Sequence, residues 1–318
     1  MRIFRHYRGV AESYRGAVVT IGNFDGVHLG HQALIAEAKR LADERGSALG
    51  VLAFEPHPQE FFHPGSESFR LTPFRTKARL IAEQGADAMF ALAFDGEMAA
   101  KSAQDFVLDV LIEGLGIGCV VVGADFQFGK GRSGDATVLS YMGEMEGFGT
   151  QIFAPVMTTG HDKISSSRIR DALKTGRPEE AARLLGHWWT VEARVEHGDK
   201  LGRTIGFPTA NMRLDHCLNP AFGVYAVRAT VLEDDKPVGQ YDGVANFGVR
   251  PMFEVATPIL ETFLFDFSAD LYGKHMAIEL IAYLRPELKL PGLDALKAQI
   301  EADSAAARSA LKSARLAP

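Results

Sequence analysis

The sequence is poor in several features that would each indicate a particular class of protein. It has 2 cysteines, Cys119 and Cys217, in 318 residues, which is too few for a disulfide framework and is typical of a reducing compartment. It lacks an apolar run of membrane-spanning length, and its opening, MRIFRHYRGVAESYR, lacks the apolar stretch of a secretory signal. The net charge of -6 argues against a sequence-independent nucleic-acid-binding face. We therefore expect a cytoplasmic protein that binds small phosphorylated molecules, neither nucleic acid nor membrane, and uses both cysteines for packing.

Apolar residues make up 47% of the sequence and charged residues 23%, and the length suits two domains better than one core. In residues 1–186 short apolar runs alternate with helical patterns, which predicts a doubly wound, Rossmann-like α/β domain. The expected strands are AVVTIG, LGVLAF, AMFALAF, CVVVGA and QIFAPV, and a helix is expected in SAQDFVLDVLIEGLG. The helix after the first strand has apolar residues at helical spacing and a glycine stop, at Leu34, Ile35, Ala38, Leu41, Ala42 and Gly46.

The secondary-structure pattern changes in residues 187–318, where short strand patterns follow one another with turn residues between them. The patterns are WWTVEARVEHG, GVYAVRATVLE, YDGVANFGV, ILETFLFDF and HMAIELIAYL. Strands this short and evenly spaced predict a small closed β-barrel. The last helical stretch, LDALKAQIEADSAAARSALKS, is expected to pack outside that barrel. The oligomeric state is left open by these patterns.

The stretch GNFDGVHLGHQ places two histidines, His28 and His31, where the first strand gives way to the first helix. Ligands bind at this end of parallel strands, and a helix N-terminus favours anions. Residues three apart share a helix face, so both imidazoles can donate to phosphate oxygens while Gly30 lets a nucleotide approach the backbone. The pattern predicts a phosphate clamp. The other residues expected to bind nucleotide here are Gly22, Asn23, Phe24, Asp25 and Gly30.

Two other interpretations of the histidine pair stay open. The spacing also arises by chance or for structural reasons, and it suits half of a zinc site that His57 would extend. Zinc is disfavoured because neither cysteine is near in sequence and no second paired-ligand motif is present.

A second polar cluster, ISSSRIR, follows the last expected strand of the first domain. Its hydroxyls and arginines are suited to a polyphosphate, although hydroxyls at a helix start are often only caps. The residues concerned are Ser165, Ser166, Ser167, Arg168 and Arg170. Two anion-favouring helix starts at one sheet predict a nucleotide site.

A third motif, GKGRSG, matches the glycine spacing of dinucleotide-binding loops. That fingerprint needs its first glycine directly after the strand, and here DFQF intervenes. We therefore interpret VVGADFQFGKGRSGD as a strand followed by a loop able to meet a flat aromatic ligand.

In this order and spacing GNFDGVHLGHQ, FEPHP, VVGADFQFGKGRSGD and ISSSRIR resemble the adenylyltransferase domain of bacterial bifunctional riboflavin kinase/FAD synthetases. The second domain resembles the riboflavin kinase barrel through GDKLGRTIGFPTAN, GVYAV, GVANFGVRP, ETFLFDF, DLYGK and LRPE. The resemblance implies substrates ATP, riboflavin and FMN, with His28 and His31 stabilising charge as FMN attacks ATP. It also implies that Thr209 and Asn211 hold Mg²⁺ with ATP. The remaining implied residues are Gly202 and Gly206 for phosphates, and Asp125, Phe128 and Arg285 for flavin, with the adenine end as the alternative for Asp125.

Glu261 would be the base that takes the proton from the ribityl hydroxyl, by the same resemblance. Period-two alternation puts it on the face of Ile259, Phe263 and Phe265, where a carboxylate is costly unless partnered and its pKa rises. The alternative is that this face looks outward at a strand end. For Thr209 and Asn211 the alternative is turn chemistry after Pro208.

Some residues depart from the family pattern. Met252 stands where threonine is usual, Trp188 and Trp189 replace a more usual opening of the barrel, and Ser167 replaces a frequent threonine. Two alternative functions therefore stay open beside the bifunctional enzyme. One is an adenylyltransferase with an impaired kinase domain, and the other is a flavin-binding regulator without turnover.

Overall fold

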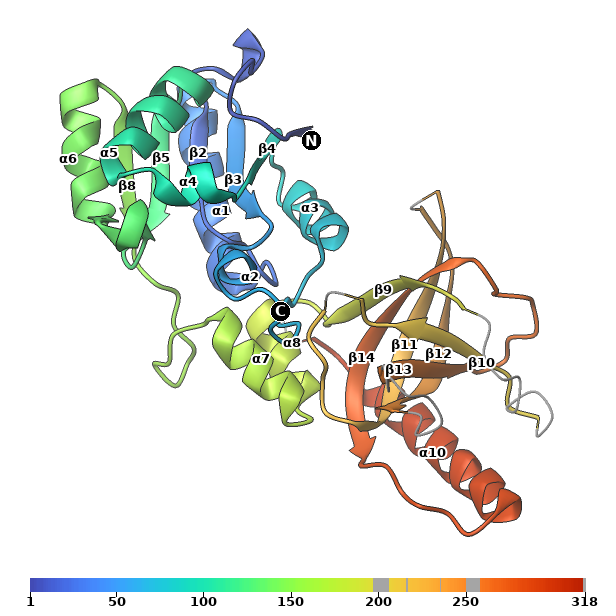
Figure 1. Cartoon of the computed structure of the whole chain (residues 1–318). Coiled ribbons are helices and arrows are strands. Elements are labelled where there is room, and N and C mark those ends of the chain that lie inside the picture. The colour runs from blue at the N-terminus through green and yellow to red at the C-terminus, as the bar shows by residue number, and fades with distance from the viewer. Residues whose placement is uncertain (197–205, 216, 235, 250–257, 317–318) are drawn as a thin grey trace. The chain divides into compact units, whose positions relative to one another are not determined.

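The computed structural model describes residues 1–196, 206–215, 217–234, 236–249 and 258–316 (Figure 1). The chain forms two compact units, Met1–Glu67 with Thr72–Ile164 and Ser68–Leu71 with Ser165–Pro318. The domain boundary that the sequence places at residue 186 stays a prediction. In the division into compact units, the two helices between residues 166 and 185 group with the second unit. No helix of the described residues is long and apolar enough to cross a membrane.

The first unit is built on a parallel sheet with strand order β1-β4-β3-β2-β5-β8. The strands are β1 (Arg2–Phe4), β2 (Val18–Ile21), β3 (Leu49–Glu55), β4 (Ala88–Ala93), β5 (Cys119–Gly123) and β8 (Gly149–Phe153). The order runs outward from β2 in both directions, so the switch point of this doubly wound sheet lies between β2 and β5. This confirms the predicted fold class. Strand β1 was not predicted, because three residues that include an arginine form no apolar run.

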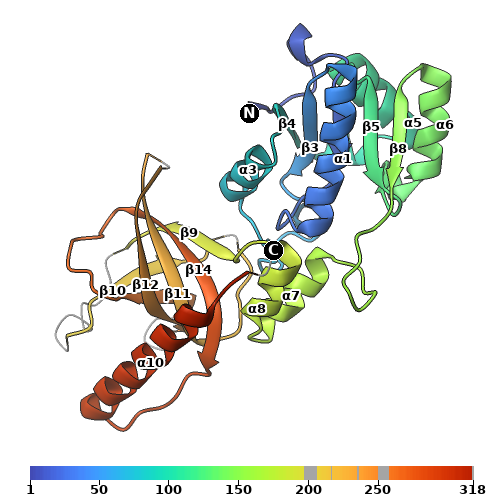
Figure 2. The same ribbon diagram turned by 180° about the vertical axis from the view of Figure 1, so that it is seen from behind.

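Helices cover both faces of this sheet, as Figures 1 and 2 show from opposite sides. One core joins α1 (Leu29–Arg45) and α3 (Phe74–Glu83) to alternate strand residues such as Val121, and the other joins the opposite residues, such as Val120, to η2 (Phe106–Leu115). The predicted glycine stop is confirmed, since Gly46 ends α1 in the left-handed region with φ 61°.

The helix expected in SAQDFVLDVLIEGLG differs from the prediction in its backbone. Only α5 (Ala103–Asp105) is α-helical, and η2 is a π-helix, although its apolar residues are buried as expected. Near the end of η2 the chain passes close to Tyr7, because a Cβ on Gly114 would lie 2.6 Å from the Tyr7 ring. The other elements of this unit are η1 (Glu12–Tyr14), α2 (Pro58–Phe62), α4 (Gly96–Ala100), β6 (Gln127–Phe128), η3 (Lys130–Arg132), β7 (Gly134–Asp135) and α6 (Ala136–Glu146).

The second unit is an antiparallel barrel with strand order β10-β13-β12-β11-β14-β9. Its strands are β9 (Thr190–Arg194), β10 (Thr209–Arg213), β11 (Gly223–Glu233), β12 (Lys236–Val249), β13 (Pro258–Leu264) and β14 (His275–Arg285). The outermost strands meet through one bridge, in which the Glu196 amide donates to the Asn211 carbonyl at 2.9 Å. The predicted barrel is thereby confirmed. The alternative of a turn around Pro208 and Asn211 is wrong, because β10 begins at Thr209 and includes Asn211.

Helix α10 (Leu293–Ser313) packs on the outer face of the barrel, as predicted. Its Ala307 and Leu311 join Val224, Val244 and Ile281 of the barrel strands in one apolar cluster. Two further helices, α7 (Ser166–Lys174) and α8 (Pro178–Leu185), precede the barrel. Both cysteines are buried and neither forms a disulfide, which agrees with packing roles.

Candidate functional sites

The first candidate site is the loop of residues 22–27, at the carboxyl end of β2 and beside the switch point of the sheet. Three of its residues have left-handed backbone conformations: Phe24 (φ 50°), Gly26 (φ 88°) and Val27 (φ 42°). The left-handed region is unfavourable for a bulky or β-branched residue, and such strain persists only where the surroundings enforce it. The loop is therefore held in one shape by its neighbours.

Thr72 provides much of that restraint. Its amide donates to Asp25 Oδ1 at 3.1 Å, its hydroxyl lies 3.4 Å from the same oxygen, and the Gly26 amide donates to the hydroxyl at 3.0 Å. Asp25 is 2% exposed and Phe24 is fully buried. The side chains of Phe24 and Asp25 thus support the loop, and a direct contact with nucleotide stays a prediction for both. Asn23 is exposed.

The two histidines lie at the start of α1. His28 is its N-cap, and Nδ1 of His28 accepts a hydrogen bond from the His31 amide at 3.3 Å. An accepting Nδ1 carries no proton, so the ring proton of neutral His28 lies on Nε2. The two imidazoles stack with centroids 3.6 Å apart and planes at 13°. The pair is therefore built into the helix start, with one donor position of His28 fixed by the cap.

The electrostatic surroundings keep His31 neutral. Burial lowers the pKa of His31 well below its ordinary value, and the nearby His28 and Lys77 lower that pKa further. Lys77 is itself buried, with its ammonium 2.9 Å from Glu55 Oε1. Stacked rings of this kind disfavour two positive charges, so the arrangement suits neutral imidazoles that donate hydrogen bonds.

Gly30 has a structural role beside the predicted one. A Cβ at this position would lie 3.1 Å from Cε1 of His28. The missing side chain therefore makes room for the His28 ring, and the approach of nucleotide to Gly30 stays a prediction. Gly22 serves Phe24 in the same way, because a Cβ there would lie 3.3 Å from that ring.

His57, which would be the third ligand if the histidine pair bound zinc, caps a helix. His57 is the N-cap of α2, and its Nδ1 accepts from the Gln59 amide at 3.1 Å. Over the residues that the structure describes, no group of three His, Cys, Asp or Glu side chains is arranged to hold a metal ion.

The loop after β5 contains the residues expected to meet flavin. Asp125 is exposed and forms an ion pair with Lys163. Phe128 is 8% exposed and packs on Phe126 and Phe106, with ring centroids 5.4 Å and 5.6 Å away. The glycine motif GKGRSG lies in the short hairpin of β6 and β7, which agrees with its interpretation as a loop. Flavin contacts of Asp125 and Phe128 stay predictions.

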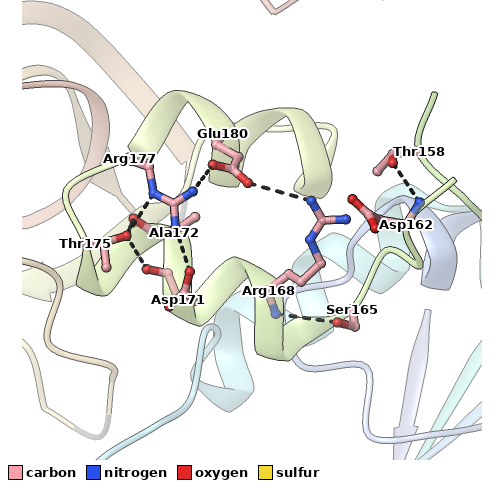
Figure 3. A network of polar contacts seen from close by, with 9 residues as sticks. All are labelled: Thr158, Asp162, Ser165, Arg168, Asp171, Ala172, Thr175, Arg177 and Glu180. Carbon is pink, nitrogen blue, oxygen red and sulfur yellow. Dashed lines mark hydrogen bonds and ion pairs between the residues drawn. The ribbon is translucent and has the colours of Figure 1, made fainter. Parts of the chain in front are cut away.

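The serine-rich cluster begins α7 in the second unit (Figure 3). Ser165 is the N-cap and accepts from the Arg168 amide at 3.4 Å. The Arg168 guanidinium lies 3.8 Å from Glu180, which also pairs with Arg177. Arg170 donates to the Phe69 carbonyl at 2.8 Å. Capping is therefore one role of this cluster. Its grouping with the two histidines in one nucleotide site stays a prediction, as do the contacts of Ser166 and Ser167.

The second candidate site is a row of polar side chains across three neighbouring strands of the barrel. Glu261 on β13 is directly opposite Asn211 on β10 and Asn246 on β12. Directly opposite residues project from the same face of a sheet. Buried Leu260, Thr262 and Leu264 alternate with half-buried Glu261, so the predicted period of two is confirmed. Thr209 is two residues from Asn211 and shares its face.

This row is on the outer face of the barrel, because Asn246 follows by two residues Val244, which packs in the cluster with α10. Asn246 Nδ2 donates to Glu287 Oε1 at 3.2 Å, and a Cβ on Gly248 would lie 2.0 Å from the same oxygen. Sequence reasoning did not single out Asn246 or Glu287. Asn246 could have been found from the sequence, because it is a polar residue in the otherwise apolar strand pattern GVANFGV.

Arg285 binds α10. Its Nε and Nη2 donate to the two carboxylate oxygens of Asp303 at 2.8 and 2.6 Å, and its flavin contact stays a prediction. Gly206 is left-handed with φ 92° and is exposed. Gly202 and Met252 lie outside the described residues.

Comparisons with known proteins match both parts of the chain. A family model described as FAD synthetase matches residues 10–168, and one described as riboflavin kinase matches residues 185–311. The bifunctional riboflavin kinase/FMN adenylyltransferase of Escherichia coli K12 is 41% identical over 312 residues, covering 97% of both chains. The Pseudomonas fluorescens enzyme of the same description is 39% identical over 310 residues, again covering 97% of each.

A solved structure shares the fold. It is a Streptococcus pneumoniae protein described as a macrolide-efflux protein, with a TM-score of 0.85, 29% identity, and coverage of 96% of this chain and 98% of that one. The two family models and the full-length relatives together assign both units. The chain therefore belongs to the bifunctional riboflavin kinase/FMN adenylyltransferase family, and it is a transferase that phosphorylates riboflavin with ATP and converts FMN with a second ATP to FAD.

Proposed function

We propose that FMN is adenylylated at the N-terminus of α1, with His28 and His31 as catalytic donors. An oxygen of the FMN phosphate attacks the α-phosphorus of ATP, and the bond from that phosphorus to the β-phosphate bridging oxygen breaks to release pyrophosphate. A phosphate nucleophile is already ionised near neutral pH, so the step needs charge stabilisation and positioning more than a base. The observation that carries this proposal is the stacked imidazole pair at a helix start, where Nδ1 of His28 accepts the cap bond and leaves Nε2 as the donor.

The nucleotide would be held by the loop of residues 22–27 and by the first turn of α1. Free amides and the positive end of the helix dipole favour phosphate at this point. Ser165, Ser166, Ser167, Arg168 and Arg170 would bind the pyrophosphate side. In that case Arg168 exchanges part of its interaction with Glu180 for the ligand.

Riboflavin would be phosphorylated at the polar row on the barrel, with Glu261 as the base that accepts the proton of the ribityl hydroxyl. The hydroxyl oxygen attacks the γ-phosphorus, and ADP leaves. The geometry that supports this role is the placement of Glu261 between Asn211 and Asn246 on one face. Amide neighbours can orient a carboxylate without adding a charge of their own.

Thr209 and Asn211 would hold Mg²⁺ together with the ATP phosphates. Their side-chain oxygens share one face of β10, and hydroxyl and amide oxygens are hard donors that suit this ion. When bound, the ion would neutralise charge on the transferring phosphate. We also propose a cytoplasmic location, for which the supporting observations are the scarcity of cysteine and the absence of a disulfide between Cys119 and Cys217.

One pair of variants tests the two sites separately. His28→Ala with His31→Ala is expected to abolish FAD formation from FMN and ATP while riboflavin is still converted to FMN. Glu261→Gln is expected to do the reverse. His63→Ala, at an exposed histidine of the first unit, is the matched control and should keep both activities. The assignment would be wrong if the histidine variant still made FAD or if Glu261→Gln phosphorylated riboflavin at the wild-type rate.

A further inference from the structure

Thr72 is hydrogen-bonded to the loop before His28, and it directly follows a segment that is hydrogen-bonded within the second unit. It is 2% exposed, and through its amide and hydroxyl it holds Asp25 and Gly26 in the middle of the strained loop. That loop leads directly into His28. The shape of the nucleotide-binding loop therefore depends on a side chain 47 residues away in the sequence.

The four residues before Thr72 belong to a different unit. Ser68–Leu71 groups with the second unit, although the chain on both sides of it belongs to the first. Three successive carbonyls of this segment accept hydrogen bonds at 2.8 Å within the second unit. Arg170 Nε donates to Phe69, the Leu218 amide donates to Arg70, and Trp189 Nε1 donates to Leu71.

The segment is also tightly packed. Phe69 and Arg70 are each 8% exposed and Leu71 is fully buried, while the Arg170 guanidinium lies 5.1 Å from the centre of the Phe69 ring. On its other side, Thr72 is followed by Pro73 at the N-cap of α3. Proline restricts the backbone of the preceding residue to extended conformations. Thr72 thus has little freedom to move relative to either neighbour in the chain.

We propose that Thr72 is a positioning residue for adenylyl transfer, and that the docked segment Ser68–Leu71 sets its position. The inference rests on the proposed nucleotide site at residues 22–31. The fold of the second unit then contributes to the shape of the ATP loop through the covalent chain. Trp189, although it precedes the riboflavin kinase strands, acts on FAD formation through the Leu71 carbonyl.

The first experiment compares Thr72→Val with Thr72→Ser. Valine has nearly the same shape but removes the hydroxyl, whereas serine keeps it. Loss of one such hydrogen bond corresponds to a change of about three- to tenfold. We expect Thr72→Val to raise KM for ATP in FAD formation by about this factor, with a smaller change in kcat, and Thr72→Ser to restore most of it. Conversion of riboflavin to FMN by the same preparation should be unchanged and reports that the second unit is folded.

The second experiment compares Trp189→Phe with Trp188→Phe. Only the first removes the hydrogen bond to Leu71, and both remove a comparable part of an indole. We expect Trp189→Phe to raise KM for ATP in FAD formation while the kinase reaction is kept, and Trp188→Phe to change neither. Wild-type KM in Thr72→Val, or equal behaviour of the two tryptophan variants, would overturn the inference. If Thr72→Val does not fold, the tryptophan pair still decides. Failure of the proposed nucleotide site itself would show in the double histidine variant.

Discussion

Replacement of His28 separates two roles that the structure places in one side chain. His28 caps α1 through Nδ1, and its Nε2 is the donor proposed for catalysis. Asparagine is among the best N-caps but has no imidazole, whereas alanine is a poor cap and also lacks the ring. His28→Asn should therefore keep the helix start, and His28→Ala should lose both roles.

The sizes of the two effects differ enough to be measured separately. Loss of an N-cap costs about 1 kcal/mol, which lowers the melting temperature of a unit of this size by about 2 to 4 °C. Removal of one preorganised donor to a developing negative charge lowers kcat by about 10² to 10³. We expect His28→Ala to show both losses and His28→Asn to show only the second.

The assay combines thermal unfolding with the rate of FAD formation from FMN and ATP, and the kinase rate of the same samples serves as the internal control. Wild-type FAD formation in His28→Asn would refute the catalytic role of the imidazole. Equal melting temperatures for the asparagine and alanine variants would refute the capping contribution.

Three further predictions follow from buried or closely packed groups. The pKa of His31 in the folded unit lies below its ordinary value of 6.5, so below about pH 6.5 the unfolded chain binds a proton at His31 more readily than the folded unit does. The free energy of unfolding should therefore decrease as pH falls below about 6.5. His31→Gln should reduce this decrease, which urea titrations at several pH values would measure. A Cβ at Gly248 would displace the Glu287 carboxylate, so Gly248→Ala should slow FMN formation but leave FAD formation from supplied FMN unchanged. Arg285→Ala removes a two-bond interaction with the carboxylate of Asp303, which is 7% exposed, and should destabilise the second unit by about 1.5 to 3 kcal/mol; unchanged urea midpoints, with Asp303→Asn as a parallel variant, would contradict this.

Prediction from the sequence worked where a structure depends on short-range patterns. The burial of Leu34, Ile35, Ala38 and Ala42 and the stop at Gly46 follow from spacing within a single helix. The strands that were missed lack such a signal. Strand β1 has no apolar run, and β10 begins beside Pro208, where turn chemistry is equally consistent with the residues. The π-helix η2 has an ordinary helical pattern of apolar residues, so spacing alone does not distinguish it from an α-helix.

The sequence by itself determined the two-domain fold class and, through its motifs, the family and its two reactions. These properties can be recognised locally, because the residues of a motif such as HLGH or PTAN are adjacent in the sequence. Only the tertiary structure decided what each side chain contacts. Asp25 meets Thr72 across 47 residues, Arg170 meets Phe69 across 101, and Asn246 meets Glu287 across 41. Such partners are brought together by chain folding over long separations, and no local pattern specifies them.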